Sequence, residues 1–355
     1  IACHEADISQ EYKQACVDYG AKDIVLTTKM SGSALTVINT PYVQSIGTEA
    51  TFWERLMNNN KSYNELAQLI NKYSQCDGIH TTKIEGLHCY KMSAPNNRLP
   101  VVYKPSIYVV AQGNKQVLLN QEVFQYTQGN YLAVSVDLPL IGEVTKASIS
   151  KPYLCAQIDI DMQIMTELAL KLQAKDELPY KTEKGIFVGS INERLINCIM
   201  RLVQLLDTPK DIPYLSSIIK QEIHYHLLSG PHGSSIIQTY LHGSNMHRIA
   251  KIIDIMKSDI AKPISVEALA TIINMSTSNF YNQFKKVTGF SPLQYLKRLR
   301  LTQARQMMLF NNTDATNTAY LVGYESPSQF SREYARLFGL PPQKEIKEFK
   351  KLITS

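Results

Sequence analysis

The sequence predicts an α+β protein in which a β-rich region precedes a wholly helical one. Residues 94–160 alternate apolar and polar side chains in short runs separated by turn residues, which is typical of antiparallel strands. Residues 161–240 change to the three- and four-residue spacing of helices. From Asn245 onward nearly every segment has helical spacing, and one pattern occurs twice. These observations together predict a β domain with attached helices, followed by an all-α domain.

The composition is typical of a soluble globular protein. The chain has 355 residues, enough for two or three domains, with 44% hydrophobic and 19% charged residues. No run reaches the roughly 20 apolar residues that a membrane helix needs, and charges occur throughout the first twenty residues, so no signal peptide is expected. The six cysteines are far apart and form no CxxC pair. We expect a cytoplasmic protein without membrane contact.

Basic residues concentrate at the C-terminal end. From Arg248 onward there are 16 Lys and Arg against 8 Asp and Glu, whereas the rest of the chain holds 21 basic and 23 acidic residues. A basic region attached to a near-neutral body indicates a module that binds a polyanion. A solvated basic face would have the same charge, so charge alone leaves both interpretations open.

The β region divides into four runs, broken by the turns at 113–115 and 128–130. The runs are VVYKPSIYVVAQG (101–113), QVLLNQEVFQY (116–126), YLAVSVDLPLIGEV (131–144) and PYLCAQIDID (152–161). Short β-branched and aromatic runs at this spacing predict an antiparallel sandwich or a small barrel.

The helices that follow carry an apolar stripe at three- and four-residue steps. Its members are Ile191, Leu195, Cys198, Ile199, Leu202 and Leu205. Such a stripe packs within its own domain or pairs with the same helix of a second chain in a dimer. The pattern leaves both alternatives open.

The doubled pattern is STSNFYNQFKKVTGFSP (276–292) and SPSQFSREYARLFGLPP (326–342). Aromatic, glycine and proline positions repeat in register, while most polar positions differ. The repeated positions are Phe280, Phe284, Gly289 and Pro292 in the first copy and Phe330, Tyr334, Gly339 and Pro342 in the second. The repeat therefore conserves the residues that shape a helix pair and varies those that face outward.

Each copy predicts two short helices and a tight turn. In the first, Ser265 and Ser276 are good N-caps, and Gly289 ends the second helix. The sequence Ser291-Pro292-Leu293-Gln294 then predicts a capping box at the start of a long basic helix. The second copy repeats this order, with Ala315, Ala319 and Val322 in a short helix, Gly323 at the turn and Ser326 with Gln329 at the next helix start.

We interpret each copy as a helix-turn-helix unit, with the long helix between them as a linker. In such a unit a short helix braces a second one, whose exposed N-terminal side chains enter the DNA major groove. Core positions must repeat for both units to fold, whereas outward positions can differ because each reads its own bases. An ordinary helical hairpin gives a similar single pattern, but two copies in register with excess positive charge favour DNA binding. Units about 34 Å apart would meet successive major grooves.

These residues resemble a known family. The region 245–345 resembles the DNA-binding domain of the AraC/XylS transcription regulators, through FKKVTGFSPLQYLKRLRLTQAR (284–305) and VGYESPSQFSREYARLFGLPP (322–342). Residues about 64–230 resemble the N-terminal domain of one AraC subgroup, through YKPSIYVVAQGNKQVLLNQEVFQY (103–126) and GNYLAVSVDLPLIGEV (129–144), and we place this domain at 57–235.

The resemblance implies an architecture and a function. It implies a cupin-like β-barrel with dimerisation helices at 57–235, used for sensing, and an all-α domain of two helix-turn-helix units joined by a linker helix at 245–345. The implied function is a sequence-specific transcription regulator, expected to be an activator. The implied partners are double-stranded promoter DNA, RNA polymerase, a small-molecule effector of unknown identity and a second copy of the chain. No cofactor or metal is implied.

Nine residues match the family's DNA-contacting positions. They are Ser278, Tyr281, Asn282, Lys285 and Lys286 in the first recognition helix, and Ser328, Gln329, Arg332 and Arg336 in the second. Asn282 suits adenine and Arg332 suits guanine, while the lysines and Arg336 suit phosphates. Each could also be a solvated surface group. One departure is Glu345-Ile346, where the family usually shows a Tyr-Arg pair, which leaves the packing of the last helix open.

Residues 1–56 resemble the C-terminal part of nitronate monooxygenases, flavin enzymes built on a TIM barrel. The similarity lies in ACHEADISQEYKQACVDYGAKDIVLTTKMSGSALTVIN (2–39). The segment lacks the flavin-phosphate glycine loop and the catalytic region, and a barrel cannot close from one helix and a strand or two. We expect a non-functional remnant without flavin, dispensable for DNA binding by residues 57–355.

An enzyme is the alternative from another class, either a cupin metalloenzyme or a flavin-dependent relative of nitronate monooxygenase. A cupin metal site needs His and carboxylate ligands clustered on neighbouring strands. His80 and His88 precede the main strands, and no histidine occurs between residues 89 and 223. The later histidines, at positions 224, 226, 232, 242 and 247, are expected to be scattered. No GxSxG or Walker A motif occurs, so we predict that the chain is not an enzyme.

Overall fold

The computed structural model describes residues 23–354, except 30–31, 40–41, 97, 174–183, 242 and 312. The chain divides into two compact units at Asn64/Glu65, and each unit is described by itself. Among the described residues, no helix is both long and apolar enough to cross a membrane.

The first unit contains a small sheet. Its strands are β1 (Asp23–Lys29), β2 (Gly32–Asn39) and β3 (Tyr42–Thr48), antiparallel and in chain order. A TIM barrel has parallel strands alternating with helices, so this meander does not have barrel topology. Helix α2 (Glu49–Lys72) continues across residue 57, where the sequence predicts a new domain. The remaining part of the nitronate monooxygenase resemblance, residues 1–22, lies outside the described residues, and the role of the segment stays a prediction.

Two antiparallel sheets form the β region of the second unit. One has the order β13-β10-β7-β12-β5-β4 and the other β6-β11-β8-β9. The strands are β4 (Gly78–Thr81), β5 (Leu87–Met92), β6 (Leu99–Tyr103), β7 (Ser106–Gln112), β8 (Asn114–Leu119), β9 (Glu122–Thr127), β10 (Asn130–Val134), β11 (Leu138–Lys146), β12 (Tyr153–Asp159) and β13 (Ile186–Ser190).

The predicted antiparallel strands within 94–160 are confirmed, although the four runs form seven strands, β6–β12. The chain turns at Gly113 alone, because Asn114 and Lys115 already belong to β8. Gly113 has φ 81°, and a Cβ there would lie 2.6 Å from the carbonyl oxygen of Lys146. One prediction was wrong in detail, since the region 161–240 contains strand β13. Its five residues pair with β10 at the sheet edge, a long-range contact that local spacing does not reveal. The two sheets share a buried core, which includes Val110, Val117 and Leu132.

Helices α3 (Met162–Gln173), α4 (Glu193–Gln204), α5 (Ile212–Leu228) and α6 (Gly233–Tyr240) follow, with a short 3-10 turn η2 (Leu205–Asp207) after α4. Asn192 caps α4 by accepting from the Leu195 backbone N–H at 2.9 Å. The apolar stripe of α4 is buried within the chain's own fold, including Leu195, Cys198 and Leu202. Of the two alternatives for this stripe, packing within its own domain is therefore the observed one.

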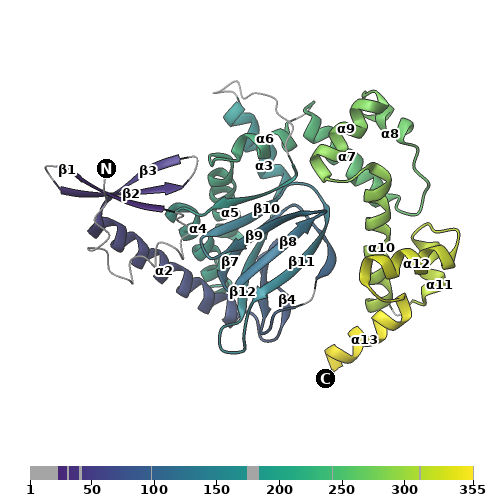
Figure 1. The fold of residues 1–355 in the computed structure, drawn as a ribbon, viewed down its shortest axis with the longest axis horizontal. Helices are drawn as coiled ribbons and strands as arrows, with labels where there is room; N and C mark the ends of the chain where they lie inside the picture. Colours follow the sequence, from purple (N-terminus) through teal and green to yellow (C-terminus); the bar gives the residue numbers. More distant parts are fainter. Residues whose placement is uncertain are drawn as a thin grey trace. The chain divides into compact units, whose positions relative to one another are not determined.

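Seven helices complete the chain: α7 (Asn245–Ser258), α8 (Val266–Ile272), α9 (Thr277–Thr288), α10 (Pro292–Phe310), α11 (Ala315–Leu321), α12 (Pro327–Phe338) and α13 (Pro342–Thr354). Figure 1 shows the long α10 joining the group α7–α9 to the group α11–α13. With 19 residues, α10 is about 28 Å long. This is the predicted order of two helix-turn-helix units and a linker.

The predicted helix ends are confirmed by their hydrogen bonds. The side chains of Ser265 and Ser276 each accept a hydrogen bond from the backbone N–H three residues later. Ser291 and Gln294 form a full capping box. Gly289 closes α9 with φ 77° and Gly339 closes α12 with φ 84°, a conformation that glycine adopts without steric cost.

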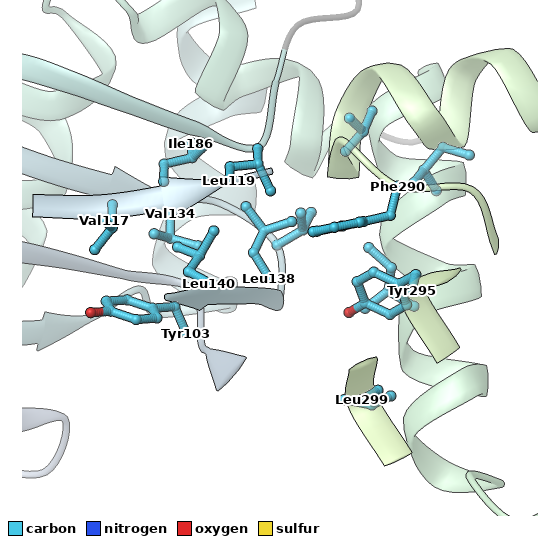
Figure 2. Packing of buried hydrophobic residues seen from close by; sticks show 14 of the residues in the cluster. Tyr103, Val117, Leu119, Val134, Leu138, Leu140, Ile186, Phe290, Tyr295 and Leu299 are labelled. Carbon is cyan, nitrogen blue, oxygen red and sulfur yellow. The ribbon is translucent and has the colours of Figure 1, made fainter. Parts of the chain in front are cut away.

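The two helix-turn-helix units have separate cores. That of the second unit is a cluster of its own, with Phe330 and Tyr334 at its centre. The core of the first unit, with Phe280 and Phe284, is continuous with the core of the two sheets. Figure 2 shows this continuity, with Leu119 and Leu138 of the sheets facing Phe290 and Tyr295. The two predicted domains, 57–235 and 245–345, are therefore joined by one core that the sheets and the first helix-turn-helix unit share.

Candidate nucleic-acid interface

Helices α9 and α12 present the predicted DNA-contacting residues. Each helix buries its aromatic face. The side chains of Phe280 and Phe284 in α9, and of Phe330 and Tyr334 in α12, are fully buried. The opposite face is polar and exposed. All nine predicted residues lie on this exposed side: Ser278, Tyr281, Asn282, Lys285, Lys286, Ser328, Gln329, Arg332 and Arg336. The structure thus brings them together on two helices, five on α9 and four on α12.

Four cations on these faces have no carboxylate partner. Within the part of the chain that the structure describes, Lys285, Lys286, Arg332 and Arg336 form no ion pair. An exposed cation without an internal partner can pair with a phosphate without first breaking a bond of its own. These side chains are therefore available to an anionic ligand.

Other basic residues of the region hold the fold instead. Arg300 of α10 donates to the carbonyls of Ile260 at 2.8 Å, Lys262 at 2.9 Å and Gly323 at 3.0 Å. It thereby ties the linker to a loop of the first unit and to the turn of the second. A Cβ on Gly323 would lie 2.3 Å from the carbonyl oxygen of Ala261, so only glycine permits this close approach. The basic linker is thus partly structural, which the charge count did not indicate.

A polar network also fixes α12 against α10. Glu333 accepts from Lys297 Nζ at 2.8 Å and from the Tyr324 hydroxyl at 2.8 Å. Burial alone would raise the pKa of Glu333, but the hydrogen bonds from Lys297, Tyr324 and Gln329 outweigh burial and lower that pKa. Gln329 reaches Glu333 at 3.4 Å. This predicted base-facing residue therefore also has a partner within its own helix.

The last helix is anchored by the residue that departs from the family pattern. The Glu345 carboxylate accepts from Arg305 Nη2 at 2.7 Å and Nε at 3.0 Å, and from the Tyr334 hydroxyl at 3.0 Å. Glu345 occupies the position that Tyr295 has in the first copy, where the ring centres of Tyr295 and Phe284 lie 5.4 Å apart. In the second copy Tyr334, at the position of Phe284, carries the hydroxyl and donates it to the Glu345 carboxylate. The departure is thus accommodated by a buried ion pair.

The two sheets built from β4–β13 contact the first helix-turn-helix unit directly. The Tyr295 hydroxyl donates to the Asp137 carbonyl at 2.8 Å, and Lys257 Nζ donates to the buried Asp137 carboxylate at 2.6 Å. The Gly185 backbone N–H donates to the Val287 carbonyl at 2.9 Å. A pocket of ≈ 550 Å³ lies between the β8–β9 turn and α9, and it is lined in part by Asn282, Lys285, Lys286 and Gly289. Helix α9 therefore borders the two sheets.

The sequence patterns did not predict one cluster of possible metal-binding side chains. Cys198 of α4 meets Glu222 and His226 of α5, with ligand atoms within 4.8 Å of one another. Of the later histidines, which were expected to be scattered, buried His224 accepts from the Asp161 backbone N–H at 3.0 Å, whereas His226 lies in this cluster. The available signal was Glu-x-x-x-His, which places both side chains on one helix face; the cysteine comes from another helix.

Comparisons with known proteins match both regions. A family model for the "AraC-type transcriptional regulator N-terminus" matches residues 83–235. A model for a "Helix-turn-helix domain" matches residues 269–347, which contain both units.

Relatives of known name match over part of their length. The HTH-type transcriptional regulator GbdR of Pseudomonas aeruginosa is 31% identical over 103 residues, which are 29% of this chain and 28% of GbdR. The HTH-type transcriptional activator RhaS of Salmonella schwarzengrund is 25% identical over 175 residues, which are 48% of this chain and 62% of RhaS. The chain thus spans less than two thirds of the length of these curated relatives.

A solved structure shares the fold. ToxT from Vibrio cholerae superposes with a TM-score of 0.54 at 14% identity, over 73% of this chain and 97% of ToxT. At this identity the likeness is one of fold, and it includes a β domain followed by helix-turn-helix units in one chain.

Proposed function

Since the chain belongs to the AraC/XylS family of transcription regulators, we propose that it is a sequence-specific DNA-binding regulator with a β-rich sensor and a double helix-turn-helix reader. The observation that carries the proposal is the pair of exposed faces on α9 and α12, which carry four cations without an ion pair among the described residues. The family is one of regulators rather than enzymes, which favours this function over the enzyme alternative. The protein would act in the cytoplasm.

The proposed mechanism divides the DNA site between the two units. Asn282 of α9 would pair with an adenine edge and Arg332 of α12 with a guanine edge. Lys285, Lys286 and Arg336 would contact phosphates. Because α10 is about 28 Å long, it is of the right order to place the two helices in successive major grooves, about 34 Å apart. Affinity would then fall steeply with salt, as phosphate contacts release counterions.

The partners follow from the same proposal. RhaS is a transcriptional activator, and we propose activation here, with RNA polymerase as the partner at a promoter. We further propose a homodimer and a cupin-like closure of the two sheets. Because the α4 stripe is buried, self-association would use the exposed residues of α5, of which Tyr214 is 75% and Ile218 60% exposed.

Replacement of Arg332 tests the reader. Arg332→Ala should weaken binding to a matched site by about 1–3 kcal/mol, or roughly 5- to 150-fold, and relax the preference at one base pair. Gel shifts at fixed salt measure this. Lys344→Ala, an equal charge change at an exposed position of α13, is the control and should change affinity little. Equal losses for both variants would contradict a base contact by Arg332.

The sensor interior suits an anionic effector. Lys115 on β8 is only 8% exposed, and its Nζ lies 4.6 Å from the ring centre of Tyr90, 5.5 Å from that of Tyr103 and 5.7 Å from that of Tyr153. Burial raises the pKa of Tyr103 and of Tyr153, so both phenols stay neutral. Lys115 has no ion pair among the described residues, and a buried charge without a counter-charge is costly. A carboxylate would supply one.

Titration with acids tests this part of the proposal. ToxT has been solved with an unsaturated fatty acid and with a naphthalenyl butenoic acid, both carboxylic acids. A fatty acid at about 100 times its Kd should stabilise the protein by about 2.7 kcal/mol, seen as a rise in Tm. The matching methyl ester, and the acid with Lys115→Met, should give no rise. Equal rises for acid and ester would contradict a role for the charge.

A further inference from the structure

Helices α4 and α5 bring three side chains together that the DNA-binding function does not use. Glu222 and His226 lie one turn apart on the same face of α5, and Cys198 reaches them from α4. Their sulfur, oxygen and nitrogen atoms all lie within 4.8 Å of one another. We propose that Cys198, Glu222 and His226 form a binding site for a divalent transition-metal ion, Zn²⁺ in particular.

The donor set fits this ion. Zn²⁺ takes thiolate, imidazole and carboxylate ligands at about 2.0–2.3 Å in a tetrahedral arrangement, so its ligand atoms lie roughly 3.5 Å apart. Closing separations of at most 4.8 Å to this value shortens each by at most about 1.3 Å. One thiolate and one carboxylate would bring two negative charges to the ion, while Arg201, paired with Glu222, adds one positive charge beside them. Ca²⁺ and Mg²⁺ fit poorly, because they prefer oxygen ligands alone.

The surroundings support the site in two ways. Arg201 forms an ion pair with one carboxylate oxygen of Glu222, Oε2, which leaves Oε1 for an ion and holds the carboxylate in place, as groups behind a metal ligand do. A pocket of ≈ 450 Å³ adjoins the cluster and is bordered by Arg194, Asn197 and Tyr225. Three protein ligands leave the fourth tetrahedral position open, and this pocket has room for water or a small anion there.

Metal titration of the full chain tests the proposal. Protein stripped with a chelator is titrated with ZnCl₂ against a chromophoric chelator, and separately with CoCl₂. One ion per chain should bind, and Cys198→Ser and His226→Gln should each weaken binding by roughly tenfold or more. Cys76→Ser, at an exposed cysteine away from the cluster, should bind like wild type. The cobalt complex should show a thiolate charge-transfer band that Cys198→Ser lacks.

The alternative outcomes are distinct. Wild-type affinity equal to that of both Cys198→Ser and His226→Gln, or a cobalt band lost only in Cys76→Ser, would overturn the site. His226 is only partly buried, so His226→Gln keeps the test valid if Cys198→Ser does not fold. Gel shifts on the same proteins test the DNA-binding function separately, because the site lies outside α9 and α12.

Discussion

Glu345→Ala is expected to lower the free energy of unfolding of the second helix-turn-helix unit by about 3–5 kcal/mol, since it leaves a buried charge without its partner. The side chain of Arg305 is 9% exposed and that of Glu345 11%. Without the carboxylate, the guanidinium is left beside the rings of Phe338 and Phe349, whose centres lie 5.6 and 4.7 Å from it. The Tyr334 hydroxyl loses its acceptor as well.

Urea unfolding followed by circular dichroism measures this loss. Glu348→Ala removes an exposed carboxylate three residues along the same helix and should change stability by no more than about 0.5 kcal/mol. The double variant Glu345→Ala with Arg305→Met should recover part of the stability, because no uncompensated charge remains. A Glu345→Ala protein as stable as Glu348→Ala would show that the pair does not hold the last helix.

Phe330→Ala should cost about 3–5 kcal/mol, because it removes an aromatic ring from a closed core. Phe330 is 0% exposed, and its ring centre lies 5.4 Å from that of Tyr324 and 5.6 Å from that of Tyr334. The core of the second unit is small and separate, so neighbouring elements can do little to close the cavity. The second recognition helix should lose its fixed position, and DNA affinity should fall with it.

Thermal unfolding and gel shifts on the same preparation check both effects. Phe310→Ala is the matched control, since Phe310 at the end of α10 is 78% exposed and its truncation should cost about 0.5 kcal/mol or less. If Phe330→Ala kept both its Tm and its affinity for DNA, the assignment of α12 as a recognition helix braced by this core would be wrong.

Local patterns predicted the reader well because its structure is specified locally. Ser276, Ser291 and Gly289 mark helix ends within four residues of the groups they bond, and the repeat of Phe280 at Phe330 marks the buried face. The exposure of Asn282 and Arg332 follows from the same spacing. These features need no knowledge of distant parts of the chain.

What the sequence did not predict depends on contacts between distant residues. Strand β13 exists because β10 pairs with it, and Arg300 is structural because loops 23 and 40 residues away offer it carbonyls. The roles of Glu345 and of the Cys198 cluster depend in the same way on partners from other helices. The core that the two sheets share with the first helix-turn-helix unit could not be foreseen either, since the sequence of each part has an ordinary amphipathic pattern.

The central claim is that a single chain recognises DNA bases with two different helices, α9 and α12. Selection of bound sites from a random DNA library, with wild type, Asn282→Ala and Arg332→Ala, tests it most directly. We predict a wild-type site with two preferred segments about one helical turn, or roughly 10 base pairs, apart. Asn282→Ala should relax one segment and Arg332→Ala the other. Relaxation of the same segment by both variants, or a wild-type site with a single segment, would contradict the claim.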